Sequence, residues 1–193
     1  MSKLIWKPGT MLYPLPAVMV SCGDNPENYN IITIAWTGTI CSEPAMTYVS
    51  IRPERHSHSI IKKSGEFVIN LTTKKLVFAT DFCGVKSGRD LNKFKELKLT
   101  PLSAEHVKAP LIKESPINIE CKVTEIKKLG SHDMFMAKVL CVHASKEYMK
   151  KDDSFDMEAA ELISYSHRNY YSLGKYLGHF GYSIRKNKKR KKK

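Results

Sequence analysis

The sequence predicts a mainly β protein, built as an antiparallel barrel with a few short helices. Short apolar or alternating stretches recur along the chain, and they lie too close together for the crossover helices that a parallel sheet requires. The composition, 42% hydrophobic and 9% aromatic, is sufficient for a buried core, and 193 residues fit one ordinary domain. A doubly wound parallel sheet is therefore disfavoured.

The first half of the chain contains four predicted strands and one helix. The strands are expected over residues 17–22, 30–36, 46–52 and 66–71. Between the last two, residues 57–64 have the features of a short helix. Ser57 can serve as its N-cap, Lys62 and Lys63 lie in its last turn, and Gly65 follows its end.

The second half predicts a helix over residues 90–97, capped by Asp90, and two longer strands. Apolar and polar residues alternate over 117–123, as in a half-buried strand, and a bulge or the strand's end is expected near 124–126, where the alternation fails. Residues 134–143 are apolar on both faces. This indicates cover by the barrel interior on one side and by a helix or a partner subunit on the other.

The net charge of +13 is concentrated at the C-terminus. Eight cations lie within residues 185–193, which leaves +5 for the remainder. We expect a domain over residues 1–184 and a disordered, solubilising tail over 185–193, with electrostatic contact to nucleic acid or anionic lipid as the alternative. The body lacks the interleaved basic and aromatic residues typical of nucleic-acid binding.

The sequence argues against several classes of protein. No apolar run is long enough to cross a bilayer, and residues 1–10 do not resemble a signal peptide, so we expect a soluble, cytoplasmic protein. Five cysteines at uneven separations predict neither a disulfide framework nor a zinc site. The common loop motifs of nucleotide-binding proteins, and those of zinc peptidases and serine hydrolases, are absent. No side chain is thereby indicated as catalytic.

Two loop-to-helix junctions combine cations with hydroxyl groups and could bind a phosphate. In the first, residues 50–57, Arg52 and Arg55 could contact an anion at a helix N-terminus. The second, residues 83–93, is expected to be a glycine-rich loop that opens a helix, with Lys93 about one turn inside it. A capped surface helix with solvated arginines and a flexible solvated loop are the alternative interpretations.

Residues 30–38 combine small and hydroxyl-bearing side chains with Trp36. A planar ligand could approach the backbone here, with Thr33 and Thr37 forming hydrogen bonds at its edge. The alternative is a core strand whose indole packs internally.

Six segments occur in a specific order along the chain: N-I-I-T-I-A-W-T-G (30–38), S-I-R-P-E-R-H-S (50–57), G-E-F-V-I-N-L (65–71), C-G-V-K-S-G-R-D-L-N-K-F (83–94), A-P-L-I (109–112) and L-G-S-H-D-M-F (129–135). Together they resemble the flavoredoxin branch of the flavin-reductase-like family, over about residues 10–180. The resemblance implies an FMN-binding split β-barrel that forms a homodimer, with the flavin near the subunit interface.

The resemblance also implies roles for individual residues. The FMN phosphate would be held by Arg52, Arg55, His56 and Ser57, with Lys93 adding charge at the phosphate or ribityl end. The isoalloxazine ring would be lined by Thr33, Ala35, Trp36 and Thr37, and Ser50 would contact the ribityl chain.

Four further residues have two interpretations under this resemblance. Cys83 is a candidate flavin contact, but a packed thiol is favoured. Tyr170 and Tyr171 are candidates for closing over the ring, with core packing as the alternative. Asn70 matches the family's strand asparagine, for which a structural role is favoured over a ligating one.

The function implied is that of an FMN-dependent oxidoreductase. Bound FMN would pass reducing equivalents from NAD(P)H or a protein donor to an acceptor, so no protein nucleophile is needed. One alternative is an FMN electron carrier without appreciable nicotinamide oxidation. The other is a basic-tailed barrel that binds nucleic acid and no flavin.

Overall fold

The computed structural model describes residues 2–184. The expectation of a disordered basic tail concerns residues 185–193, which lie outside the described residues. Within residues 2–184, no helix has both the length and the apolar character needed to span a membrane.

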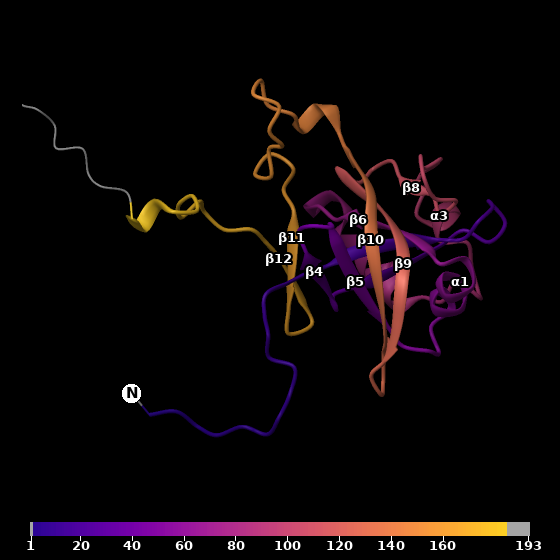
Figure 1. Cartoon of the computed structure of the whole chain (residues 1–193), viewed down its shortest axis with the longest axis horizontal. Helices are drawn as coiled ribbons and strands as arrows, with labels where there is room; N and C mark the ends of the chain where they lie inside the picture. Colours follow the sequence, from indigo (N-terminus) through magenta and orange to yellow (C-terminus); the bar gives the residue numbers. More distant parts are fainter. Residues whose placement is uncertain (1, 185–193) are drawn as a thin grey trace, which may run out of the picture.

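One antiparallel sheet dominates the structure (Figure 1), so the mainly β prediction is confirmed. Its seven strands lie in the order β3-β2-β6-β9-β10-β5-β4. Their bounds are β2 (Val18–Cys22), β3 (Asn30–Ile34), β4 (Thr37–Cys41), β5 (Met46–Ile51), β6 (Glu66–Leu71), β9 (Ile117–Lys128) and β10 (Asp133–Ala144).

The two edges of this sheet are joined by only two residues. β3 and β4 lie at opposite ends of the strand order, yet only Ala35 and Trp36 separate them in sequence. The sheet must therefore curl until its edges meet, and the Ser50 N–H donates to the Trp36 carbonyl at 2.9 Å across this junction. The interior of the curled sheet is filled by a continuous apolar cluster around Phe67 and Phe135, both fully buried.

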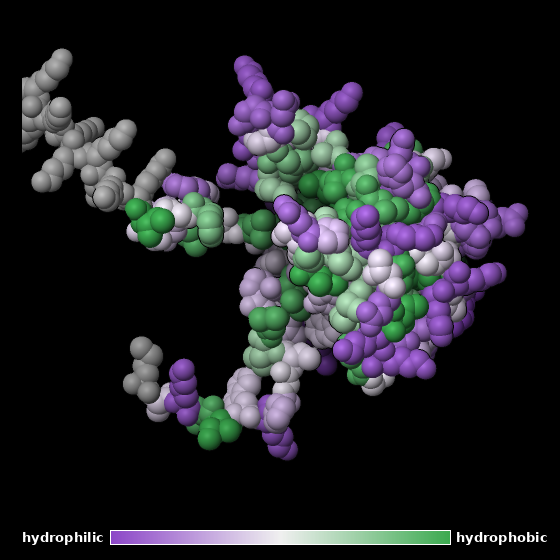
Figure 2. Space-filling model, viewed as in Figure 1, coloured by the Kyte–Doolittle hydropathy of each residue, from purple (hydrophilic) through white to green (hydrophobic). Residues whose placement is uncertain are grey.

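Small elements surround the barrel. A three-stranded sheet combines β1 (Leu15–Pro16), β11 (Ile163–Ser166) and β12 (Asn169–Ser172), and β7 (Pro101–Leu102) pairs with β8 (Leu111–Ile112). Three 3₁₀ turns complete the connections, η1 (Lys74–Leu76), η2 (Lys146–Tyr148) and η3 (Tyr182–Ile184). Both terminal segments extend away from the body (Figures 1 and 2) and expose apolar side chains such as Trp6 and Phe180.

Helix α1 (His56–Ser64) begins one residue earlier than predicted. Its N-cap is Arg55, in an extended conformation, and Gly65 closes its C-terminus as expected. The prediction that Ser57 caps this helix is wrong. Ser57 lies inside the first turn, is buried, and accepts a hydrogen bond from the Asn30 side chain at 2.8 Å. A tertiary contact therefore uses the hydroxyl that a local capping interaction would have used.

The expected glycine-rich loop from residue 83 is in part a helix. α2 (Val77–Val85) includes Cys83 and Gly84, and α3 (Lys93–Glu96) begins at Lys93 with Asn92, not Asp90, as its side-chain cap. The glycine at position 84 lets α2 pack closely on β3, because a Cβ there would lie 3.3 Å from Thr33 Cβ. In the sequence, a glycine that allows a helix to pack closely on a strand cannot be distinguished from a glycine in a loop.

The structure corrects one strand prediction and confirms another. The strand expected over 30–36 ends at Ile34, and β4 follows as a separate edge strand that its Thr-Gly-Thr sequence concealed. The irregularity expected near residues 124–126 is confirmed as a bulge. The pairing of β9 with β10 shifts register at Thr124, and β9 then continues to Lys128.

Candidate functional site

Two neighbouring cavities lie where the sheet edges meet the helices. The first, about 180 Å³, lies between β3, the N-terminus of α1, α2 and the loop that leads to α3. The second, about 130 Å³, lies over the β3–β4 junction and the end of β5. Ile32 and Arg55 line both cavities, so the two adjoin, and together they are called the cleft below.

The cleft brings together most of the residues predicted from the sequence. The first cavity is lined by Arg55, His56, Ser57, Cys83 and Lys93, among others. The second is lined by Thr33, Ala35, Trp36, Ser50 and Arg52, with Arg55 shared. Segments 30–36, 50–57 and 83–93, which are separate in sequence, thus line one site.

Two predicted residues do not line either cavity. Thr37 is buried, and its hydroxyl donates to the Tyr48 carbonyl at 2.5 Å, which secures the start of β4 against β5. Tyr171 is exposed on β12, in the separate three-stranded sheet. Its neighbour Tyr170 instead forms a hydrogen bond with Asp81 at 3.2 Å. The proposed contacts of Thr37 and Tyr171 with a flavin remain predictions.

The first cavity has a strongly positive lining. Its lining includes the cations Arg55, Lys86, Arg89 and Lys93. Glu54 is the one acidic residue among the described residues that line it. Burial, followed by the charges of Arg89 and Lys93, lowers the pKa of His56 below its ordinary value of 6.5. The imidazole is therefore neutral at pH 7 and can offer a hydrogen bond without adding charge. The cavity favours an anion.

The N-terminus of α1 contributes further positive potential. No side chain within residues 2–184 caps it, and its first turn contains no acidic residue. Backbone N–H groups at such an end are available to an oxygen ligand, and the helix dipole favours negative charge there. Together with Arg52 and Arg55 immediately before the helix, this arrangement has the chemistry of a phosphate site.

Lys93 has a structural anchor inside the cleft. Its side chain is almost completely buried, and its Nζ donates to the Ile31 carbonyl on β3 at 2.7 Å and to the Cys83 carbonyl at the end of α2 at 2.9 Å. Burial lowers the pKa of its ammonium group. Lys93 thus joins β3 to α2 while contributing charge to the cavity. Its predicted contact with the phosphate or ribityl end stays a prediction.

Cys83 and Asn70 have the environments expected of packed residues. Burial raises the pKa of the Cys83 thiol to about 11, so it stays protonated at neutral pH. Asn70 is fully buried, donates to the Met19 carbonyl at 2.9 Å and accepts from the Ile112 N–H at 3.0 Å. Its structural role is confirmed.

The second cavity is suited to a flat group. Trp36 and Ala35 are half-buried at the β3–β4 junction, and the Thr33 hydroxyl already donates to the Thr80 carbonyl at 2.5 Å. Hydrogen bonds to a ligand's edge would therefore come from the backbone here. His132 also lines this cavity, and burial with the nearby Arg52 charge lowers the pKa of its imidazole. His132 lies in the segment 129–135 that carries the family resemblance, but it received no predicted role, because a turn histidine carries no local signal of its tertiary neighbours.

Gly88 lines the first cavity at a position that has no room for a side chain. A Cβ at this position would lie 2.1 Å from Asn30 Oδ1, and Asn30 is itself held by Ser57. Gly88→Ala is therefore expected to displace the loop or Asn30 and weaken binding of a phosphate-bearing ligand in this cavity about tenfold, roughly 1.4 kcal/mol. Fluorescence titration with FMN, the ligand that the sequence resemblance implies, measures this. Gly174→Ala, whose added Cβ would meet no atom within 4 Å, is the matched control. Equal affinities of both variants would contradict the assignment.

Comparisons with known proteins agree with this architecture. A family model described as flavin reductase like domain matches residues 10–174. An uncharacterised protein of Pyrococcus abyssi is 34% identical over 146 residues, which are 76% of this chain and 80% of that protein.

Solved structures agree as well. Flavoredoxin of Desulfovibrio vulgaris superposes with a TM-score of 0.88 at 28% identity, over 95% of this chain and 100% of that chain. An FMN-binding protein from Thermus thermophilus, at 18% identity, superposes with a TM-score of 0.77 over 93% of this chain and 99% of that chain, which supports the fold alone.

Proposed function

The chain belongs to the flavin reductase like domain family, and from this premise we propose that it is an FMN-dependent oxidoreductase. Bound FMN would accept reducing equivalents from NAD(P)H or a protein donor and pass them to an acceptor. The observation that carries the proposal is the cleft, in which a cationic cavity adjoins a cavity beside an indole.

The residues present fit the phosphate end of a flavin mononucleotide. Arg52 and Arg55 precede the uncapped N-terminus of α1, and the neutral His56 and the Ser57 backbone N–H lie in its first turn. Such a site provides both charge-assisted hydrogen bonds and the helix dipole. The concentration of cations in one cavity favours a dianionic phosphomonoester over an uncharged riboflavin.

The β3–β4 junction fits the ring end. The small side chain of Ala35 leaves the backbone accessible, and Trp36 supplies an aromatic wall. Backbone N–H groups there would hydrogen-bond the polar edge of the ring, and Arg52 would favour negative charge on it. When bound, FMN supplies the hydride and electron-transfer chemistry. The protein positions the ring, excludes water from one side and stabilises charge.

We further propose that the chain functions as a homodimer. On β10 the side chains of Leu140 and Val142 are exposed, and apolar residues of both terminal segments are exposed as well. A second copy covering these surfaces would bury them. The expectation that a partner covers the second face of residues 134–143 rests on the same pattern.

The purified protein tests the proposal directly. We expect a yellow protein with about one FMN per chain and, by light scattering, twice the mass of one chain. Under anaerobic stopped-flow conditions NADH or NADPH should bleach the flavin absorbance. A colourless protein that fails to bind added FMN would contradict the proposal. Bound FMN that only dithionite reduces would contradict nicotinamide oxidation and favour the electron carrier.

A further inference from the structure

Three potential metal ligands lie together on the surface of the sheet that faces away from the barrel core. In the β9–β10 ladder, Cys141 is paired directly with Glu120, so the two side chains share a face. His143 lies two residues beyond Cys141 on the same strand, which places it on that face too. One ligand atom from each of the three residues lies within 4.8 Å of the others.

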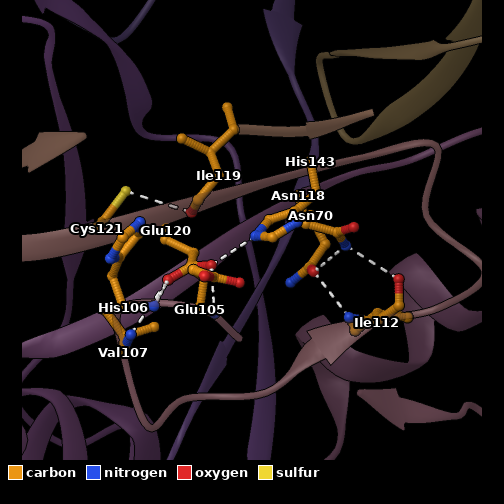
Figure 3. A network of polar contacts seen from close by, with 10 residues as sticks. All are labelled: Asn70, Glu105, His106, Val107, Ile112, Asn118, Ile119, Glu120, Cys121 and His143. Atoms are coloured by element: carbon orange, nitrogen blue, oxygen red, sulfur yellow. Dashed lines mark hydrogen bonds and ion pairs between the residues drawn. The ribbon is translucent and has the colours of Figure 1, made fainter. Parts of the chain in front are cut away.

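Glu120 is held rigidly in this cluster (Figure 3). Its side chain is fully buried, and its carboxylate accepts hydrogen bonds from the N–H groups of Glu105 at 2.8 Å, His106 at 2.6 Å and Val107 at 3.1 Å. His143 Nε2 approaches Glu120 Oε1 at 2.5 Å. The backbone contacts orient one ligand in advance, so less conformational entropy is lost when an ion binds.

The other two ligands are accessible and adjustable. Cys141 and His143 are both half-buried at the end of the β9–β10 pair, beyond the residues of β10 that pair with β5. Zinc bonds of about 2.0–2.3 Å would set tetrahedral ligand atoms roughly 3.3–3.8 Å apart. The imidazole nitrogen, 2.5 Å from Glu120 Oε1, must therefore move slightly away from that oxygen, whereas the Cys141 Sγ already lies within 4.8 Å of both other ligand atoms.

The chemistry of the three ligands favours Zn²⁺. A thiolate with an imidazole nitrogen and a carboxylate oxygen suits Zn²⁺, whereas Mg²⁺ and Ca²⁺ prefer oxygen ligands alone. The uneven cysteine spacing predicted no zinc site, but that pattern reports only sites with several cysteines. A site with one cysteine assembled across two strands leaves no such spacing.

We propose that Glu120, Cys141 and His143 bind one Zn²⁺ ion per chain, with a water molecule as the fourth ligand. On binding, the Cys141 thiol proton is released to solvent, and neutral His143 carries its remaining proton on Nδ1. The ion replaces the direct contact between His143 and Glu120. It crosslinks β9 to β10 and, through Glu120, to residues 105–107. The site lies outside the cleft that we assign to flavin, so its test does not depend on the proposed function.

Calorimetric titration of the purified, chelator-treated protein with Zn²⁺ tests the proposal. We expect one ion per chain and a rise in Tm with Zn²⁺, since a ligand that binds the folded state stabilises it. Cys141→Ser and His143→Gln should each weaken binding at least ~100-fold, because even outer-shell partners of a metal contribute 10–100-fold. The circular dichroism spectrum should be unchanged in both variants, which reports intact folding.

Cys41→Ser is the matched control. Cys41 is also a half-buried strand cysteine, and its Sγ lies 3.3 Å from the Glu43 carbonyl oxygen. This variant should bind Zn²⁺ as the unmodified protein does. The proposal is overturned by the absence of stoichiometric binding, by unchanged affinity in both ligand variants, or by an anomalous-scattering peak for zinc elsewhere than between the three side chains. If one ligand variant fails to fold, the other decides.

Discussion

Replacing Arg52 and Arg55 together with alanine is expected to yield a folded but colourless protein. Each arginine would contribute a charge-assisted hydrogen bond to the FMN phosphate, worth roughly 1.5–3 kcal/mol. Losing both should weaken FMN affinity by about 10²–10⁴-fold. Neither side chain supports the core, since both are exposed and the contact of Arg52 with Glu54 is a surface ion pair at 3.6 Å.

The measurement is the flavin-to-protein ratio after purification, followed by FMN titration and circular dichroism. The control is Lys62→Ala with Lys63→Ala, which removes two cations from the last turn of the same helix. This control should keep its colour. A double arginine variant that stays yellow with unchanged FMN affinity would remove the phosphate assignment and, with it, the proposed orientation of the ring.

Glu120→Gln is expected to destabilise the fold by about 3 kcal/mol. The carboxylate accepts three backbone N–H groups while fully buried, and an amide has only one oxygen to offer. Its NH₂ group would face donors that then lack acceptors, and each buried unsatisfied donor costs about 1–3 kcal/mol. Urea denaturation with a chelator present, which excludes any contribution from metal ions, measures the loss.

Glu114→Gln is the matched control for this substitution. Glu114 is an exposed carboxylate that also accepts a backbone N–H, from Thr100 at 3.1 Å. Water can replace that contact, so we expect a loss below about 1 kcal/mol. Equal losses of unfolding free energy from the two substitutions would show that the buried contacts of Glu120 contribute no more to stability than the exposed contact of Glu114.

The pH dependence gives the Glu120 prediction a second readout. Burial by itself would raise the pKa of this carboxyl, but hydrogen bonds from His143 and from the Glu105 and His106 N–H groups outweigh it, so the pKa lies below the ordinary 4.5. A lowered pKa in the folded state means that the ionised form stabilises the fold above about pH 4.5, and that this stability is lost as pH falls further. The stability difference between the original protein and Glu120→Gln should therefore be largest near neutral pH and shrink in acid.

Local sequence patterns were sufficient to predict much of the fold. Period-two alternation over 117–123 and its failure near 124–126 located both β9 and its bulge, because side-chain direction in a strand depends only on neighbouring residues. The same patterns failed at α2, where Gly84 has the sequence signal of a loop but serves close packing against β3.

By itself, then, the chain's sequence determined six of the seven strands of the main sheet, the helix after Arg55 and the presence of two cationic junctions, since these depend on residue type and local spacing. Only the tertiary structure decided that the edges β3 and β4 meet at Trp36, that Lys93 reaches the Ile31 carbonyl, and that Glu120 faces Cys141. The physical reason is that closure of the sheet is set by the packing of a whole core. Contacts between residues tens of positions apart follow from that closure and leave no trace in local periodicity.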